Sequence, residues 1–95
     1  MPADPIFLES AIAPALRYFA LNGGAAGDHT VTGIEVGDKI HAVLHFTITA
    51  GNFTALDVIT SEFTVTAANT INNAGGTSTT GDRLLVIYSK HEVQN

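Results

Sequence analysis

The segment from Lys39 to Thr49, KIHAVLHFTIT, constrains the fold of this chain more than any other stretch. Apolar residues occupy every second position from Ile40 to Ile48, and most of the positions between them are polar. Such a period of two is typical of a β-strand, because successive side chains of a strand point to opposite sides. The segment therefore predicts a long strand whose apolar face lies on the core and comprises Ile40, Ala42, Leu44, Phe46 and Ile48.

Two shorter segments, residues 15–21 (ALRYFAL) and 83–88 (RLLVIY), predict strands that are apolar on both faces. Alternation opposes Leu16 and Tyr18 to Phe19 and Leu21, and likewise Leu84 and Val86 to Leu85 and Ile87. Strands of this kind are buried on both sides, so in a domain this small we expect one side to meet another subunit. The predicted interface comprises Leu16, Tyr18, Phe19, Leu21, Leu85, Val86, Ile87 and Tyr88.

Two weaker patterns predict further strands. Residues 29–36, HTVTGIEV, follow a glycine-rich loop and are rich in β-branched residues, which favours a strand. Residues 62–66, EFTVT, return to alternation, with Phe63 and Val65 facing inward. Between these lies a segment that fits two structures. Because Thr54 and a following acid resemble a helix capping box, residues 54–60 form either a helical turn or an irregular strand.

The stretch TINNAGGTSTTGDRLLVIY contains the spacing G-x-x-x-x-G of a phosphate-binding loop, from Gly76 to Gly81. Such a loop needs Lys and then Ser or Thr after its second glycine. Here Asp82 and Arg83 stand at those positions, and a strand follows where a helix N-terminus should bind the anion. We therefore interpret the stretch as a long polar turn rich in Asn and Gly, in which Ile71 contacts the core.

The dipeptide Gly-Asp occurs at residues 27–28, 37–38 and 81–82. Each copy stands where the chain must turn before it enters a predicted strand. Glycine tolerates the backbone conformations that a turn requires. We predict one turn device used three times, and no true sequence repeat.

At 95 residues the chain forms a single domain. Pro2, Pro5 and Pro14 fix the backbone and remove donors, which favours an extended N-terminal arm over residues 1–14, followed by one β domain over residues 15–95. The predicted fold is all-β, a small antiparallel β-sandwich or barrel-like domain. The chain lacks cysteine and is 45% hydrophobic but only 14% charged, so we expect it to gain stability by burying surface in an oligomer.

The net charge of −5 argues against two classes of partner. The fixed cations are scattered along the chain, as Arg17, Lys39, Arg83 and Lys90, whereas binding of nucleic acid or of an anionic membrane needs clustered cations. No apolar run reaches the roughly 20 residues that cross a bilayer. The N-terminal segment lacks the basic start of a signal peptide, so we expect synthesis in a cytoplasm without export.

The sequence predicts no enzyme, no cofactor and no metal site. His41 and His45 share one face of the predicted strand but lie about 13 Å apart at roughly 3.3 Å per residue, too far to share a metal within one chain; geometry leaves open a metal site between subunits. We expect both to face solvent or an interface. His91 and Glu92 fall in a terminal tail, where nothing would hold a catalytic geometry.

The chain resembles small structural proteins of tailed bacteriophages. The matching segments are DKIHAVLHFTIT and TSEFTVTAANTINNAGGTSTTGDRLLVIY, which are similar to the pattern S-E-F-T-(I/V)-(S/T)-A-x-x-T-I-x-N, then G-G-T-(D/S)-T-x-G-D and a hydrophobic strand. The lead-in RYFALNGGAAGDHTVTGIEVGDKI is similar as well, so the resemblance covers about residues 16–88. Its matching residues form turns and strands, and it brings no catalytic residues.

Proteins of that type include head decoration, or cement, proteins, which are small, β-rich and often trimeric. The resemblance implies a non-enzymatic virion structural protein made in the host cytoplasm. On the capsid surface it would form a homotrimer, contact the major capsid protein and stabilise the shell, with the arm of residues 1–14 reaching a neighbouring subunit. The alternative is a tail- or fibre-associated β module that binds carbohydrate or protein; the lack of Trp counts against carbohydrate.

Overall fold

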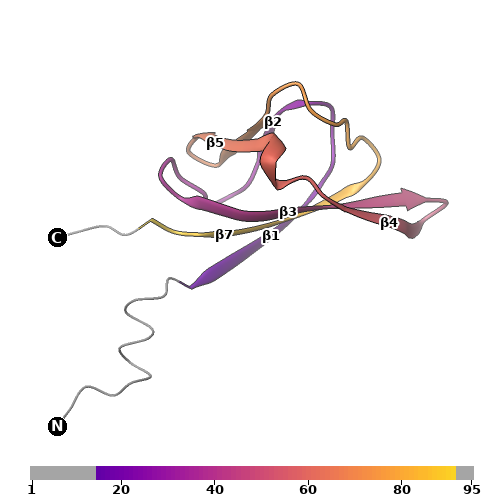
Figure 1. Ribbon diagram of the computed structural model, residues 1–95, viewed down its shortest axis with the longest axis horizontal. Coiled ribbons are helices and arrows are strands. Elements are labelled where there is room, and N and C mark those ends of the chain that lie inside the picture. Colours follow the sequence, from indigo (N-terminus) through magenta and orange to yellow (C-terminus); the bar gives the residue numbers. More distant parts are fainter. Residues whose placement is uncertain (1–14, 92–95) are drawn as a thin grey trace, which may run out of the picture.

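Seven strands form two antiparallel sheets that pack face to face in the computed structural model, which describes residues 15–91 (Figure 1). Sheet A contains, in spatial order, β1 (Leu16–Asn22), β7 (Arg83–Ser89), β3 (Lys39–Thr49) and β4 (Asn52–Val58). Sheet B contains β2 (Gly27–Thr30), β6 (Thr70–Asn73) and β5 (Phe63–Ala67). The predicted antiparallel β-sandwich is confirmed. The predicted arm of residues 1–14 lies outside the described residues.

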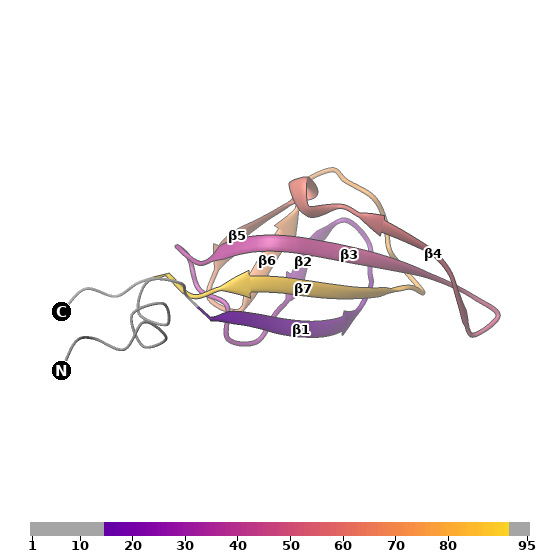
Figure 2. The ribbon, with the colours of Figure 1, turned by 60° about the horizontal axis from the view of Figure 1, so that its bottom comes forward.

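The last strand in the sequence, β7, lies in the middle of sheet A, between β1 and β3 (Figure 2). Residues opposite each other in an antiparallel ladder point to the same face. Val86 pairs with Phe19 on one side and with Val43 on the other, so these three face sheet B. The core between the sheets consists of Val31, Ile34, Val43, Ile59, Phe63, Ile71, Leu84, Val86 and Tyr88.

The bounds predicted for β3 are confirmed, but the predicted inner face is wrong. Val43 and His45 are buried against sheet B, whereas Leu44 and Phe46 lie half-buried on the opposite side. The cause is a register shift between Ile40 and Ala42, where β3 holds one more residue than β7. Such a bulge reverses the faces of the residues that follow it. Ile40 still packs on the core, but the apolar residues after it face outward.

The β3–β4 hairpin projects beyond sheet B (Figures 1 and 2). All residues of β4 are exposed, on both faces of the strand. The ambiguous segment contains both predicted structures in succession, because β4 continues to Val58 and a single 3₁₀ turn follows at Thr60–Glu62. The capping box does not form: the Thr54 hydroxyl instead lies 3.0 Å from that of Thr49 across the hairpin.

The strand predicted over residues 29–36 needs correction. It ends at Thr30, because the backbone turns at Gly33 and Gly37, where φ is 98° and 104°. Its apolar side chains, Val31 and Ile34, are nevertheless fully buried.

The predicted turn after β5 contains a strand. Residues Thr70–Asn73 form β6, between β2 and β5. The expected burial of Ile71 is confirmed, as is the inward orientation of Phe63 and Val65. The sequence did not predict β6 because two of its four residues are Asn, and Asn favours turns. Tertiary pairing on both edges overrides that preference here.

Candidate functional site

The three Gly-Asp dipeptides share a backbone conformation and a role. Gly27, Gly37 and Gly81 have positive φ values of 120°, 104° and 86°, and a strand begins at or just after each dipeptide. Each aspartate accepts hydrogen bonds from a residue far away in the sequence: Asp28 from Asn72, Asp38 from Lys90 and His91, and Asp82 from His45 and Ile48. The predicted turn device is therefore confirmed, and each aspartate also binds a segment that is distant in the sequence: β6 for Asp28, the residues after β7 for Asp38, and β3 for Asp82.

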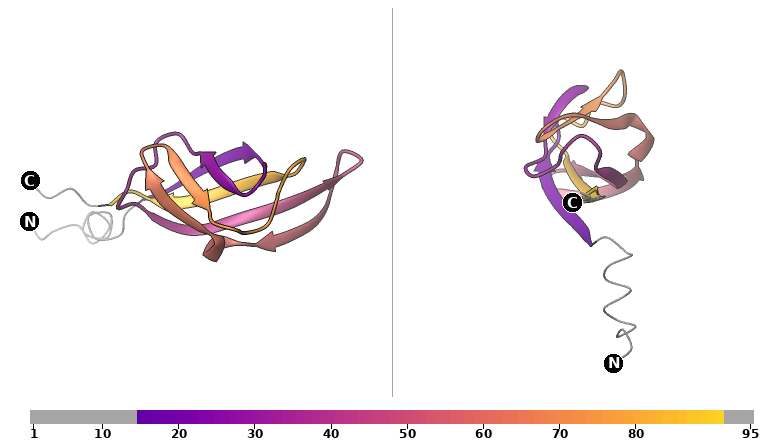
Figure 3. Two further views of the ribbon diagram at one scale, coloured as in Figure 1. Left: turned by 90° about the horizontal axis from the view of Figure 1, so that it is seen from above. Right: turned by 90° about the vertical axis from the view of Figure 1, so that its left-hand side faces the viewer.

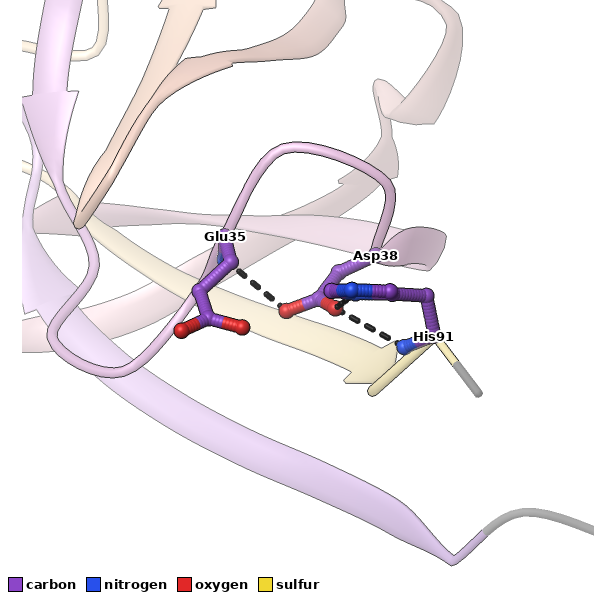
Figure 4. A group of neighbouring side chains, drawn as sticks. All are labelled: Glu35, Asp38 and His91. Carbon is purple, nitrogen blue, oxygen red and sulfur yellow. Dashed lines mark hydrogen bonds and ion pairs between the residues drawn. The ribbon is translucent and has the colours of Figure 1, made fainter. Parts of the chain in front are cut away.

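Asp38 is the centre of a polar cluster, and Figure 4 shows three of its side chains, those of Glu35, Asp38 and His91. Its side chain has no exposed surface. Oδ1 accepts hydrogen bonds from the backbone N–H and from Nδ1 of His91, at 2.8 and 2.7 Å. Oδ2 accepts from the backbone N–H of Glu35 at 2.9 Å and from the Lys90 ammonium at 2.8 Å. All four acceptor positions of the carboxylate are thus filled.

The carboxylates of Glu35 and Asp38 and the ring of His91 lie close enough together to suggest a metal site. Lys90 already occupies the cation position among these groups. Its ammonium lies 2.7 Å from the carbonyl oxygen of Gly33, 2.8 Å from Asp38 Oδ2 and 3.1 Å from Glu35 Oε1. Three acceptors satisfy its three protons. A divalent ion would have to displace this ammonium, so the donor set fits a structural ion pair better than a metal.

The same contacts shift the pKa values of the pair in opposite directions. Burial raises the pKa of the Asp38 carboxyl, but hydrogen bonds from Lys90 and His91 outweigh it and hold the pKa well below its usual range. The hydrogen bond to Asp38 raises the pKa of Lys90, against a smaller opposing effect of burial. Both groups therefore remain charged at neutral pH.

The expectation that nothing holds His91 is wrong, because Asp38 fixes both its backbone and its ring. An Asp–His pair is part of hydrolytic triads. A histidine–hydroxyl pair is also present, but it involves another histidine: Nε2 of His41 lies 2.9 Å from Oγ of Ser89. The carboxylate and the hydroxyl thus contact different histidines, and the two pairs do not form a triad. Glu92 lies outside the described residues.

Asp82, which stands where a phosphate-binding loop would carry Lys, fixes the turn to β3. The carboxylate points back into the protein, where Oδ2 lies 2.7 Å from Nε2 of the buried His45 and Oδ1 accepts the backbone N–H of Ile48 at 2.9 Å. The Ile48 N–H and the His45 side chain lower the pKa of Asp82. The interpretation as a polar turn is supported, and the expectation that His45 faces solvent or an interface is wrong.

The rest of this loop is held by Glu62. Its carboxylate accepts the backbone N–H of Thr77 at 2.7 Å, the Thr77 hydroxyl at 3.1 Å and the Asn73 amide at 3.2 Å. The Thr77 N–H, acting against burial, lowers the pKa of Glu62. Gly76 packs so closely on Asn73 and Glu62 that a side chain there would collide with both. The loop is thus fixed in place by side chains of the sandwich.

The structure divides the predicted interface residues into two groups. Leu16, Tyr18, Leu85 and Ile87 lie on the face of sheet A that points away from sheet B. Val86 and Tyr88 are buried in the core, and Phe19 and Leu21 pack against it. The prediction for these last four is corrected, since they face sheet B of the same chain.

The outer face, as we call the side of sheet A turned away from sheet B, is apolar across all four strands. Rings of Phe46 and Phe53, from neighbouring strands, lie 5.4 Å apart on it. Its members are Leu16, Tyr18, Ala20, Ala42, Leu44, Phe46, Ile48, Phe53, Leu56, Val58, Leu85 and Ile87. The largest exposed fractions are those of Phe53, Val58 and Tyr18, at 70%, 67% and 66%. A contiguous apolar face of this kind is a candidate interaction site.

Two open grooves are found on the surface of residues 15–91. One, of about 380 Å³, is lined by Gly37, Asp38, Lys39, Ile40, Phe63, Thr64 and Val65. The other, of about 290 Å³, lies at the hairpin and is lined by Ile48, Gly51, Phe53, Gly81 and Arg83. The one carboxylate among these residues is that of Asp38, whose oxygens are already fully hydrogen-bonded.

Among residues 15–91, no helix has the length and apolar character needed to span a membrane. Comparison of the chain with protein-family models, with curated proteins and with solved structures gives no match.

Proposed function

We propose that this chain is a non-enzymatic structural protein of a bacteriophage virion, a capsid decoration protein that forms a homotrimer on the head, contacts the major capsid protein and stabilises the shell. The resemblance of residues 16–88 to such proteins suggests the class. The observation that carries the proposal is the outer face, because a four-stranded apolar surface has to be covered for the domain to stay soluble. Assembly on a shell would cover it.

The polar clusters also support a structural role. The aspartates and Glu62 direct their hydrogen bonds into the protein, where they fix loops to strands. This arrangement makes a small domain without cysteine rigid. A rigid module with one adhesive surface suits a protein that reinforces a shell.

A module of a tail or fibre is the second candidate, and one observation favours it. Tyr18 and Phe53 are exposed aromatic residues, and exposed aromatic rings stack on sugars. Their neighbours on the outer face are aliphatic, however, and offer few polar groups for sugar hydroxyls. The face therefore suits a protein partner better than a carbohydrate.

The copy number of the chain in purified virions tests the proposal. Quantitative mass spectrometry would compare it with the major capsid protein. We expect an abundance comparable to that of the capsid subunit. A few copies per particle would favour the tail or fibre candidate, and absence from the virion would refute both.

A further inference from the structure

We propose that the outer face is the surface through which copies of this chain bind one another, with the β3–β4 hairpin as its most exposed part. The inference deepens the proposed function by naming the contact surface of the oligomer. It is argued from the placement of side chains in residues 15–91, and its test is independent of the virion.

The β3–β4 hairpin, which extends beyond sheet B (Figure 3), has reversed polarity. In β3, Phe46 and Ile48 lie on the outer face, whereas Thr47 and Thr49 lie on the side of sheet B. The opposite strand follows the same rule: Leu56 and Val58 face outward, and Asp57 faces the other way, opposite His45. In a monomeric β-sandwich, the apolar side of each strand faces the core between the two sheets. Here the hairpin directs its apolar side away from the protein's own core.

The outer face also exposes a large apolar area. An aromatic side chain presents roughly 150–250 Å², so Tyr18 and Phe53, at 66% and 70% exposure, together expose on the order of 200–340 Å². Leu16, Leu56 and Val58, at 50%, 56% and 67%, add further apolar area. A stable interface buries about 800 Å² per partner, of which somewhat more than half is apolar, so these five side chains supply a large part of the apolar area that such an interface needs.

Charge favours a second copy over a charged partner. The carboxylates of the described residues, Asp28, Glu35, Asp38, Asp57, Glu62 and Asp82, lie in loops, in sheet B or on the inner side of sheet A. Of the cations, Lys39 lies at one end of the outer face, and Arg83 lies opposite Phe46, beside the hairpin. Two outer faces can therefore meet without burying a carboxylate, whose desolvation would oppose assembly. Each acidic group of the copies stays outside the contact.

The edge of β4 limits how two copies can meet. Within residues 15–91, this strand pairs with β3 on one side only. Edge strands are protected from further ladder pairing by Lys, by Pro, by bulges or by inward-pointing charges, and β4 has a register shift opposite Thr47 and Ile48 and the inward-facing Asp57. We therefore expect copies to meet through the apolar side chains of the outer face and not by extending sheet A.

The test is the mass of the full-length chain in solution, measured by sedimentation velocity and native mass spectrometry over a range of concentrations. The variants Leu56→Lys and Val58→Lys place a charge on the outer face at positions that are 56% and 67% exposed. Val36→Lys is the matched control, because Val36 is 61% exposed but lies in the loop before β3. Circular dichroism and urea unfolding verify that each variant is folded.

We expect the wild-type chain and Val36→Lys to assemble alike into multiples of the 9.9 kDa subunit. Leu56→Lys and Val58→Lys should weaken assembly about tenfold or more, because each buries an unpaired charge. A wild-type chain that stays monomeric near 100 μM (about 10⁻⁴ M) would overturn the inference, as would outer-face variants that assemble like the wild type. If the monomer is nevertheless abundant in virions, and Val58→Lys is lost from them, the capsid protein is the partner of this face, and the inference fails while the proposed function stands.

Discussion

Nδ1 of His91 lies 2.7 Å from Oδ1 of Asp38, although 53 residues separate them in the sequence. The contact ties the residues that follow β7 to the turn that precedes β3. Lys90 joins the same carboxylate from the other side. This clamp closes one end of sheet A, where its two central strands meet.

Asp38→Asn should lower the free energy of unfolding by about 1.5–3 kcal/mol, because it removes charge-assisted hydrogen bonds at a buried position. Chemical denaturation with urea measures the change. Asp28→Asn is the matched control: Asp28 is exposed and accepts one hydrogen bond, from Asn72, so its replacement should change stability by no more than about 0.5 kcal/mol. Equal effects of the two variants would contradict the role of the clamp.

Stability should fall on the acid side and on the alkaline side of a wide plateau. The pKa values of Asp38, Glu62 and Asp82 are lowered in the folded state, so their contribution is complete above the usual carboxyl range of about 4 and is lost as pH falls through the lower folded-state values. The pKa of Lys90 is raised, so its contribution is complete below about 10.4 and is lost as pH rises beyond it.

Urea midpoints between about pH 2 and about pH 12 check this prediction, because the alkaline decline begins only above about 10.4. The Asp38→Asn variant should lose part of the decline below pH 4, since its side chain does not titrate (the usual Asp value is about 3.9). A midpoint that stays constant as carboxyl groups are protonated would show that the clamps contribute nothing to stability.

Leu84 and Leu85 are adjacent leucines on opposite faces of β7, and the fold assigns them different roles. Leu84→Ala should cost about 2–5 kcal/mol, because Leu84 is fully buried between the sheets. Leu85→Ala should cost clearly less, since Leu85 is half-buried on the outer face. Both are measured by urea unfolding in a Val58→Lys background, so that burial between copies does not contribute. The reverse order would mean that sheet B packs on the other side of β7.

Gly23 and Gly24 offer a test of the packing between the loop after β1 and the loop before β7. A side chain at Gly23 would collide with the backbone carbonyl of Thr79, whereas at Gly24 it would lie 3.6 Å from the ring of His29, an ordinary contact. Gly23→Ala should therefore cost about 1–3 kcal/mol or more. Gly24→Ala should be neutral or stabilise by up to about 1 kcal/mol. Thermal unfolding compares the two, and a tolerated Gly23→Ala would contradict this loop packing.

The sequence predicted the fold class and the bounds of β3 because period-two alternation and β-branched residues depend on local geometry alone. The inner face of β3 could not be predicted in the same way. A register shift at Ile40 and Ala42 depends on how β7 pairs with the strand, and this pairing leaves no mark in the periodicity. Val43 and His45 consequently appeared on the polar side of the pattern, although they are buried.

The clamps show a similar limit. The positive φ of Gly37 and Gly81 could be anticipated from the Gly-Asp dipeptide, since a glycine before a strand signals a turn. The partners of Asp38 and Asp82 could not, because they are 34 to 53 residues away. His91 looked unsupported for this reason. The Asp after each turn glycine was the signal in the sequence that could have indicated a distant hydrogen-bond donor at these turns.

The position of β7 also has a consequence for synthesis on the ribosome. β1 and β3 form no ladder with each other, and each pairs with β7. Until residues 83–89 have left the ribosome, sheet A exists only as separate pieces: β1 alone, and the β3–β4 hairpin. Sheet A is therefore completed only when the central strand enters between β1 and β3, after most of the chain has been synthesised.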